Sequence, residues 1–228
     1  MKALVLFSGG LDSTVCLGMA VDKYGKDEVM ALSVYYGQKH KKELEAAKKI
    51  EEYYGIKRIE LDLGEIFKDS GCSLLAGASE AIPEGDYAEQ LKTTGGAPVT
   101  TYVPFRNGLF LSSAAAIALS YGCEELYYGI HADDAAGNAY PDTSSEFNAA
   151  ISDAIYIGSG KAIKVVAPFV TKTKAQVVSL GRSLKVPFEL TWSCYEGKEK
   201  ACGKCGTCID RLAAFRVNGM EDPIEYEQ

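Results

Sequence analysis

The first sixty-three residues alternate between short apolar runs and amphipathic stretches. Three runs are apolar and bounded by turn residues, and the two stretches between them have apolar residues at helical spacing. The predicted strands are 2–7, 29–36 and 57–63, and the predicted helices are 12–24 and 39–54. This β-α-β-α-β order is typical of a parallel sheet with helices on both faces.

The same alternation returns after a long interruption. Residues 70–104 are punctuated by Gly and Pro, which predicts a long loop region of the kind that usually carries function, with a disordered insertion as the alternative. Beyond it the predicted helices are 106–121, 145–156, 173–183 and 207–217, and the predicted strands are 125–130 and 163–167. The chain is therefore predicted to be an α/β protein with a five-stranded parallel sheet over residues 1–190 and a small segment, 191–228, packed on it.

Composition narrows the classes of partner. Lys and Arg number 24 and Asp and Glu number 31, so the net charge is −7. That charge argues against a nucleic acid as the main partner, without excluding a local basic pocket for a small anion. No apolar run approaches the ~20 residues that span a bilayer, and the apolar N-terminal run is too short for a signal peptide. We expect a cytoplasmic protein with no membrane partner.

A tight corner, SGGLDST, joins the first predicted strand to the first predicted helix. Gly9 and Gly10 allow the backbone to approach a ligand closely, and the first N–H groups of the helix attract anions. Hydroxyl donors come from Ser8, Ser13 and Thr14. The corner therefore predicts a phosphate site. Asp12 is its only acid, and would either bind Mg²⁺ or cap the helix.

This corner resembles the pyrophosphate loop of the ATP pyrophosphatase superfamily, whose enzymes cleave ATP between the α- and β-phosphates and transfer AMP to an oxygen of the substrate. The resemblance implies that ATP is a substrate, with Mg²⁺ sharing its charge. The residues that would hold ATP are Ser8, Gly9, Gly10, Leu11, Asp12, Ser13, Thr14 and Val15.

Four of the seven cysteines crowd together near the C-terminus. They are Cys194, Cys202, Cys205 and Cys208. Four thiolates at this spacing suit one tetrahedral Zn²⁺ per chain, and four protein ligands indicate a structural site whose loss would destabilise the fold. An iron–sulfur cluster is the main alternative, although the ferredoxin run ends in a further Cys and a Pro where this chain has Ile209 and Asp210.

Three further stretches narrow the superfamily to one family. VPFRNGLFLSSAAAIA at 103–118, YYGIHADD followed by AYPDTSSEF, and TWSCYEG followed by CGKCGTC are similar to motifs of the 7-cyano-7-deazaguanine synthase family. The resemblance runs from Val5 to about Pro223 and implies a three-layer, Rossmann-like fold of the adenine nucleotide alpha hydrolase kind. It also implies a homodimeric C–N ligase that converts 7-carboxy-7-deazaguanine and ammonia, with ATP, to 7-cyano-7-deazaguanine (preQ0) in queuosine biosynthesis. The carboxylate and then the amide would be adenylated.

Several polar residues near predicted strand ends or helix starts are candidates for the reaction. The expected substrate residues are Arg106, Asn107, His131, Asp133 and Asp142, and the expected catalytic residues are Asp12, Arg106, Lys172 and Lys174. The Arg106 guanidinium would bind a carboxylate or a phosphate of the ligands, or it would instead form a structural ion pair within the fold. Asn107 would meet a base edge or cap its helix, the acids would bind Mg²⁺ or a ring amino group, and the lysines would contact phosphate or solvent. Trp192 and Tyr195 would stack on a base or pack internally.

Three positions depart from the family pattern. Phe105 stands where Gly is usual, His131 where Asn is usual, and residues 135–138 lack two aromatic residues. These changes suggest altered substrate fit. Two other functions fit part of the sequence. A tRNA-thiolating enzyme would have the same loop, but the acidic charge disfavours it, and a nucleotide-binding zinc module without activity is disfavoured by the extent of the resemblance.

Overall fold

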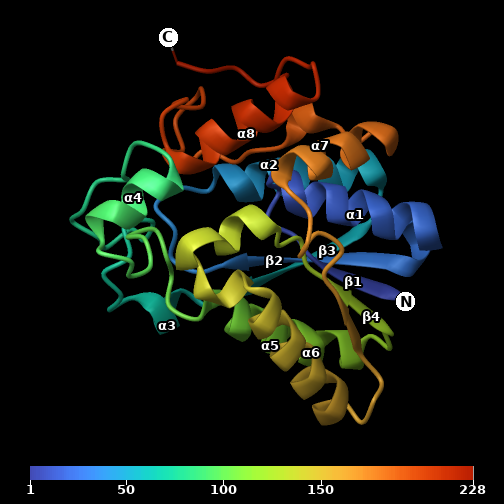
Figure 1. The fold of residues 1–228 in the computed structure, drawn as a ribbon. Helices are drawn as coiled ribbons and strands as arrows, with labels where there is room; N and C mark the ends of the chain where they lie inside the picture. Colours follow the sequence, from blue (N-terminus) through green and yellow to red (C-terminus); the bar gives the residue numbers. More distant parts are fainter. Residues whose placement is uncertain (228) are drawn as a thin grey trace.

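The computed structural model describes residues 1–227, and its centre is one sheet of five parallel strands. The strands stand in the order β3-β2-β1-β4-β5 (Figure 1). Their bounds are β1 Ala3–Leu6, β2 Val29–Tyr35, β3 Lys57–Asp62, β4 Glu125–Tyr127 and β5 Lys164–Val166. The predicted sheet is confirmed. β4 is shorter than its apolar run because the chain beyond Tyr127 bends toward the loop after β1, where Gly129 lies against Asp12.

Helices cover both faces of this sheet, which confirms the three-layer prediction. In Figure 1, α1, α2, α7 and α8 lie on one side, and α5 and α6 lie on the other. The long helices are α1 Leu11–Tyr24, α2 Lys42–Tyr54, α5 Arg106–Ser120, α6 Ser145–Gly158, α7 Lys174–Ser183 and α8 Gly206–Val217. The short ones are α3 Gly64–Phe67, α4 Tyr87–Thr93 and the 3-10 turns η1 Lys26–Glu28, η2 Ala132–Asn138, η3 Pro141–Thr143 and η4 Phe188–Leu190.

Successive residues of the central strands point into two separate cores. Ala3 and Val5 of β1 pack with α1, α2, α7 and α8, whereas Leu4 packs with α5 and α6. All three side chains are fully buried, as expected for a parallel strand covered on both faces. Both cores therefore fix the position of the loop that follows β1.

The Gly- and Pro-rich region 70–104 is packed rather than extended away from the domain. It contains α4, whose N-cap Asp86 accepts a hydrogen bond from the Glu89 N–H at 2.8 Å. Leu75 and Val103 are buried beside Tyr36 at the end of β2. The region therefore forms a wall at the edge of the sheet where the strands end.

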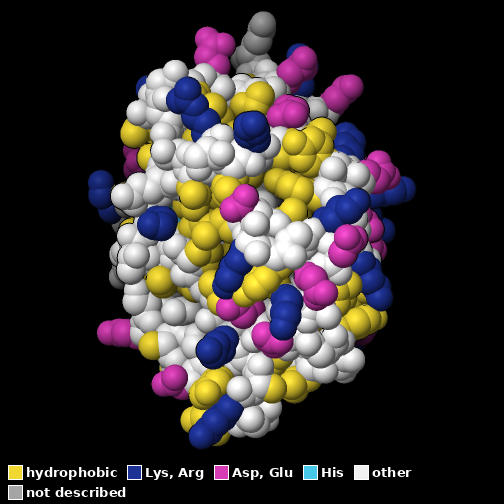
Figure 2. Space-filling view, turned by 90° about the vertical axis from the view of Figure 1, so that its right-hand side faces the viewer, with side chains coloured by type: hydrophobic (Ala, Val, Ile, Leu, Met, Phe, Trp, Pro, Cys, Tyr) yellow, Lys and Arg dark blue, Asp and Glu magenta, His cyan; other side chains and the backbone are white. Residues whose placement is uncertain are grey.

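Figure 2 shows the side of the molecule that lies to the right in Figure 1. Lys and Arg side chains are mixed there with Asp and Glu, and hydrophobic side chains lie between them. This is the mixed surface typical of an ordinary solvent-exposed face. Within residues 1–227, no helix combines the length and apolar character needed to cross a membrane.

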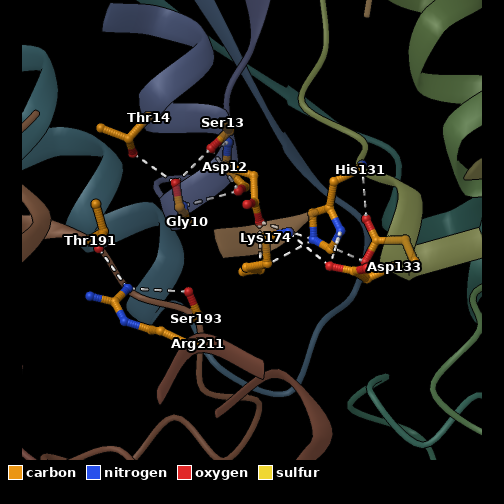
Figure 3. Close-up of polar contacts among 12 residues, drawn as sticks. Gly10, Asp12, Ser13, Thr14, His131, Asp133, Lys174, Thr191, Ser193 and Arg211 are labelled. Carbon is orange, nitrogen blue, oxygen red and sulfur yellow. Dashed lines mark hydrogen bonds and ion pairs between the residues drawn. The ribbon is translucent and has the colours of Figure 1, made fainter. Parts of the chain in front are cut away.

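A buried ion pair lies within the C-terminal segment, and its arginine also donates from Nη2 to the Phe188 carbonyl of the preceding chain at 3.2 Å. Arg211 of α8 is fully buried and donates from Nε and Nη2 to Asp222 at 2.6 and 2.9 Å. Its Nη1 donates to Thr191 and Ser193 at 2.7 and 3.3 Å (Figure 3). Because α8 shares a core with α1 and α7, the described part of the segment, residues 191–227, is packed on the sheet domain, and the division at residue 190 stays a prediction.

We expect Arg211→Met to lower the free energy of unfolding by about 3–5 kcal/mol, because it leaves the Asp222 carboxylate buried without a cation. Urea unfolding followed by circular dichroism measures this change. Arg182→Met, on the exposed side of α7, is the matched control and is expected to change little. An Arg211→Met protein as stable as the control would contradict this account of the segment.

Candidate active site

A cavity of about 230 Å³ opens at the edge of the sheet where the strands end. Its walls include Ser8 after β1, Tyr36 after β2 and Tyr128 after β4. The strand order reverses between β1 and β4, and an open parallel sheet binds ligands at such a switch point. The cavity is therefore in the place where this architecture favours a ligand.

The loop between β1 and α1 forms one wall of the cavity as a closed turn. Gly10 is the N-cap of α1, and its carbonyl accepts hydrogen bonds from Ser13 Oγ at 3.0 Å and Thr14 Oγ1 at 2.7 Å (Figure 3). Ser8 Oγ accepts from the Gly10 N–H at 3.1 Å. The first N–H groups of α1 have no partner inside the helix and are available to an anion.

Not all of the predicted ATP residues face the cavity. Its lining includes Ser8, Gly10, Leu11, Asp12 and Ser13. Gly9, Thr14 and Val15 instead support the loop from behind, with Val15 fully buried in the core.

Three other segments hold this loop in place. Gly9 has a φ of +86°, and a Cβ there would lie 2.3 Å from the Glu43 carbonyl oxygen in α2. A Cβ on Gly129, which follows β4, would lie 3.0 Å from the Asp12 carbonyl. The N–H of Trp192 donates to the Gly9 carbonyl at 3.0 Å, so this tryptophan packs behind the loop and does not line the cavity.

Lys174, at the start of α7, lies in a network of charges beneath the loop. Its Nζ is 2.7 Å from Asp12 Oδ2 and 3.4 Å from His131 Nε2 (Figure 3). Burial raises the pKa of Asp12, but Lys174 and His131 outweigh burial and hold that pKa below its ordinary value. Burial lowers the pKa of Lys174, but Asp12 and Asp134 hold it above its ordinary value. The ion pair therefore stays charged at neutral pH.

The Asp12 side chain does not cap its helix. Gly10 is the N-cap of α1, and it has no side-chain cap. Asp12 Oδ1 is buried and has no hydrogen-bond partner among residues 1–227, while Oδ2 is bound to Lys174. One carboxylate oxygen thus remains for a metal ion or a ligand.

The two acids predicted to meet substrate instead cap helices. Asp133 Oδ2 accepts from the Lys174 N–H at 2.7 Å, at the start of α7. Asp142 Oδ2 accepts from the Asn107 N–H at 2.8 Å, at the start of α5. Burial raises the pKa of Asp142, partly offset by that N–H. Neither acid lines the cavity, and each is hydrogen-bonded to a residue that does, so their predicted contact with substrate stays a prediction.

His131 and Lys172 also lie outside the cavity lining. His131 is 1% exposed, and its Nε2 is 3.4 Å from Asp134 Oδ1, so it belongs to the buried network of charged groups around Lys174. The backbone carbonyl of Lys172 accepts from the Ala132 N–H at 2.9 Å. The roles predicted for these two residues therefore stay predictions, and the structure gives them supporting positions.

Arg106 and Asn107 open α5 and line the cavity. The Arg106 guanidinium lies 5.3 Å from the centre of the Tyr36 ring and 6.0 Å from that of Phe110, with Nη1 donating to Tyr36 Oη at 3.5 Å. No carboxylate within the described part of the chain lies at ion-pair distance from it. A partly buried cation between aromatic rings, without a counterion, favours an anionic ligand.

Other walls of the cavity come from residues that the sequence did not single out and from Tyr195, which it did. Glu43, Asp134 and Asp210 bring carboxyl groups. Burial raises the pKa of Asp210 to about 6, although Lys174 opposes the shift. Tyr195 Oη lies 3.0 Å from Tyr87 Oη and 3.2 Å from Tyr140 Oη. The adjacent Cys194 was the one available signal for Tyr195.

The four clustered cysteines form a compact set of ligands next to the cavity. Their sulfur atoms all lie within 4.8 Å of one another, and all four residues are buried. Backbone N–H groups donate to Cys194 Sγ from Cys202 at 3.3 Å and to Cys202 Sγ from Cys205 at 3.3 Å. Ser193 and Tyr195 flank Cys194 and line the cavity, so this segment couples the metal ligands to the site.

Comparison with known proteins agrees with the motifs. A sequence model described as queuosine biosynthesis protein QueC matches residues 2–219. A 7-cyano-7-deazaguanine synthase of Archaeoglobus fulgidus is 41% identical over 98% of this chain and 90% of its own. One of Picrophilus torridus is 44% identical over 99% of this chain and 92% of its own.

Two solved structures share the fold. The NMN synthetase of Francisella tularensis has a TM-score of 0.52 and 16% identity, covering 96% of this chain and 78% of its own. The U34-tRNA thiolase NcsA of Methanococcus maripaludis, with its [4Fe-4S] cluster, has a TM-score of 0.53 and 18% identity, covering 96% of this chain and 67% of its own. The family matches confirm the resemblance seen in the motifs, and the chain belongs to the QueC family of queuosine biosynthesis proteins.

Proposed function

We propose that this protein is a 7-cyano-7-deazaguanine synthase, which uses ATP to convert 7-carboxy-7-deazaguanine and ammonia to the nitrile. The observation that carries the proposal is that one cavity is lined both by the loop residues Ser8 and Gly10 to Ser13, whose geometry suits phosphate, and by Arg106, a guanidinium with no counterion among the described residues. A reaction that joins a nucleotide phosphate to a carboxylate needs both anions in one place. Family membership and the names of the relatives support the same substrate class.

The chemistry requires activation of two poor leaving groups. A carboxylate oxygen attacks the α-phosphorus of ATP, and pyrophosphate leaves toward the N–H groups of the loop, where preorganised donors stabilise the developing charge. Ammonia then displaces AMP to give the amide. The amide oxygen is adenylated in the same way, and loss of AMP leaves the nitrile.

The loop, Lys174 and Asp12 are proposed to serve the nucleotide. Lys174 would hold the Asp12 carboxylate in place through the 2.7 Å ion pair and add positive charge near the phosphates. The unpartnered Asp12 Oδ1 fits an ion that prefers oxygen ligands, and Mg²⁺ bound there would neutralise phosphate charge.

Arg106 and its neighbours are proposed to bind the other substrate. The guanidinium would bind the carboxylate, and the rings of Tyr36 and Phe110 provide apolar surface beside it. The Asn107 side chain, which donates to the Asp142 carbonyl at 3.2 Å, is held at the cavity wall and keeps its amide oxygen for the base. Here Phe105, with a φ of +54°, replaces the Gly expected before Arg106.

We propose that the four cysteines hold one Zn²⁺. A tetrahedral site with Zn–S bonds of about 2.3 Å places its sulfurs about 3.8 Å apart, and Cys202 Sγ lies 4.0 Å from Cys208 Sγ. A [4Fe-4S] cluster would need more room between the same thiolates, because irons and sulfides lie between them. When bound, the zinc would hold the cavity wall that contains Ser193 and Tyr195.

Loss of this metal is expected to lower stability. Cys208→Ser should lose bound metal and several kcal/mol of folding free energy, which at roughly 2–4 °C per kcal/mol lowers Tm by about 10 °C or more. Cys72→Ser, a buried thiol outside the cluster, is the control and should keep its metal. Elemental analysis and thermal unfolding measure both effects. Iron with sulfide in the wild type, or an unchanged Tm without metal, would contradict the zinc proposal.

The function is tested by incubating the full chain with ATP, Mg²⁺, ammonium and 7-carboxy-7-deazaguanine. Mass spectrometry is expected to show the amide first and the nitrile later. ATP consumption that depends on tRNA and a sulfur donor, with no nitrile, would instead favour a thiolating enzyme. No ATP consumption with either partner would indicate a nucleotide-binding module.

A homodimer in the cytoplasm is part of the same proposal. The dimer rests on family membership. The cytoplasmic location rests on the four clustered thiols, because free thiols persist in a reducing compartment. Light scattering of the purified protein is expected to give twice the 24.5 kDa mass of one chain. A monomer at the concentration of the activity assay would contradict the dimer.

A further inference from the structure

One carboxylate in the cavity wall has no role in the chemistry described so far. Glu43 is the second residue of α2 and lines the cavity. Its side chain makes no hydrogen bond or ion pair with any other residue that the structure describes. A carboxylate held at a cavity wall without a partner is available to a ligand.

The position of Glu43 is fixed by the phosphate loop on one side. Gly9 packs so closely on α2 that a Cβ there would lie 2.3 Å from the Glu43 carbonyl oxygen and 2.5 Å from the Ala47 nitrogen. Arg106 lines the same cavity, and its positive charge acts on the Glu43 carboxyl. Glu43 therefore shares one cavity with the loop proposed to hold phosphate and with the guanidinium proposed to hold the substrate carboxylate.

Under the proposed function, the reacting carbon lies in this same cavity, between the phosphate loop and Arg106. In the adenylated substrate, the oxygen bonded to the α-phosphorus is also bonded to the carbon that ammonia attacks. A group between the phosphate loop and Arg106 thus faces the bond that forms to nitrogen. A residue that only recognised the edge of the base would be expected farther from the loop.

We propose that Glu43 is the general base that removes protons from the substrate nitrogen. This inference rests on the proposed function. In the first stage, ammonium gives a proton to the Glu43 carboxylate, the nitrogen electron pair forms the C–N bond, and the C–O bond to AMP breaks. The bonded nitrogen, which still carries three protons, gives a second proton to the phosphate of the departing AMP and becomes the neutral amide. In the second stage, the amide loses one N–H proton to solvent as its oxygen is adenylated. The neutral adenylated imidate then gives its remaining N–H proton to Glu43, that electron pair completes the nitrile, and the second C–O bond to AMP breaks. Glu43 returns each proton to solvent.

The surroundings of Glu43 suit this task. Burial raises its pKa to about 7, while Arg106 acts in the opposite direction. The titratable groups that face it are Arg106 of α5 and Tyr36 at the end of β2, and Tyr195 lines the same cavity. Burial raises the pKa of Tyr36 and Tyr195, so these hydroxyls stay protonated at neutral pH. A base with a pKa near the working pH is the most effective one.

The test compares Glu43→Gln with Glu45→Gln, which changes an exposed acid on the same turn of α2. We expect Glu43→Gln to lower kcat for nitrile formation at least about 100-fold with an unchanged KM for the acid, from either the acid or the amide as substrate. Because the carboxylate is the active form, wild-type kcat should rise with pH through about 7. This rise of kcat with pH should be absent in Glu43→Gln. It should be present in Glu45→Gln and, with a lower kcat, in Glu43→Asp.

The outcomes separate this inference from the proposed function. If wild type and Glu45→Gln form nitrile and Glu43→Gln matches them in rate and pH profile, only the inference is overturned. A higher KM for the acid with unchanged kcat would mean that Glu43 recognises substrate and is not the base. If Glu43→Gln does not fold, the pH profile of Glu43→Asp decides. If the wild type itself forms no nitrile, the proposed function fails, and the inference with it.

Discussion

Gly9→Ala is expected to abolish ATP-dependent turnover. A methyl group at this position would lie 2.3 Å from the Glu43 oxygen and 2.5 Å from the Ala47 nitrogen, and both are backbone atoms that cannot rotate away. The loop must therefore move away from α2, and its N–H groups would no longer point toward the departing pyrophosphate. Loss of one preorganised donor costs roughly 100- to 1000-fold in rate, and the loop supplies several, so we expect a decrease of more than about 1000-fold.

The matched control is Gly25→Ala at the other end of α1. Gly25 also has a positive φ, +78°, but nothing lies within 4 Å of a Cβ there. Both variants bear the cost of an unfavourable φ, about 1–2 kcal/mol, and only Gly9→Ala bears the clash. Steady-state kinetics and thermal unfolding separate the two effects. Equal activity in the two variants would contradict the tight contact between the loop and α2.

Arg106→Met is expected to remove substrate binding without lowering stability. The guanidinium has no counterion among the described residues, so the fold loses no ion pair when it is replaced by an apolar side chain. The substrate carboxylate, in contrast, loses a charge-assisted pair worth about 2–5 kcal/mol. At tenfold per 1.4 kcal/mol, kcat/KM for the acid should fall roughly 30-fold to several thousand-fold.

Arg58→Met should show the opposite pattern. Arg58 lies on β3, away from the cavity lining, and pairs with Glu51 at 2.8 Å and Glu60 at 2.7 Å. Its loss is expected to lower the free energy of unfolding and leave kcat/KM unchanged. If Arg106→Met lowers Tm as much as Arg58→Met while keeping its kcat/KM, Arg106 is a structural residue.

The parts of the site that could be predicted are those written in contiguous sequence. SGGLDST follows an apolar run and precedes a helical pattern, and this local order is enough to place it at the ligand-binding edge of the sheet. The cysteine spacing likewise predicts a cluster that the structure brings together. Fold and family are confirmed for the same reason, because both depend on patterns repeated along the chain.

The remaining walls could not be predicted because they depend on long-range packing. Tyr87, Tyr140 and Tyr195 are far apart in sequence and meet only through the fold. Glu43 lies within a charged helical stretch, where nothing marks it out from its exposed neighbours until α2 packs on Gly9. From the sequence, Asp133 and Asp142 are only loop acids near the sheet edge, available to Mg²⁺ or substrate, and it takes the fold to show that each accepts a hydrogen bond from an N–H at the start of a helix.

The departure at Phe105 has a conformational explanation. Phe105 is the N-cap of α5 with a φ of +54°, in the left-handed region that Gly adopts without strain. Its ring packs edge-on against Phe147 at 6.0 Å. We infer that this contact offsets part of the backbone strain and keeps Arg106 at the cavity wall.

The most direct test of the central claim follows the oxygens of the substrate carboxylate. If the loop holds pyrophosphate while adenylate passes to the substrate, oxygen-18 in the carboxyl group must leave with AMP at each stage. We expect mass spectrometry of the nucleotides to show labelled AMP, with one labelled oxygen in each molecule formed and no ADP. ADP as the product, or AMP without label while nitrile accumulates, would contradict the account.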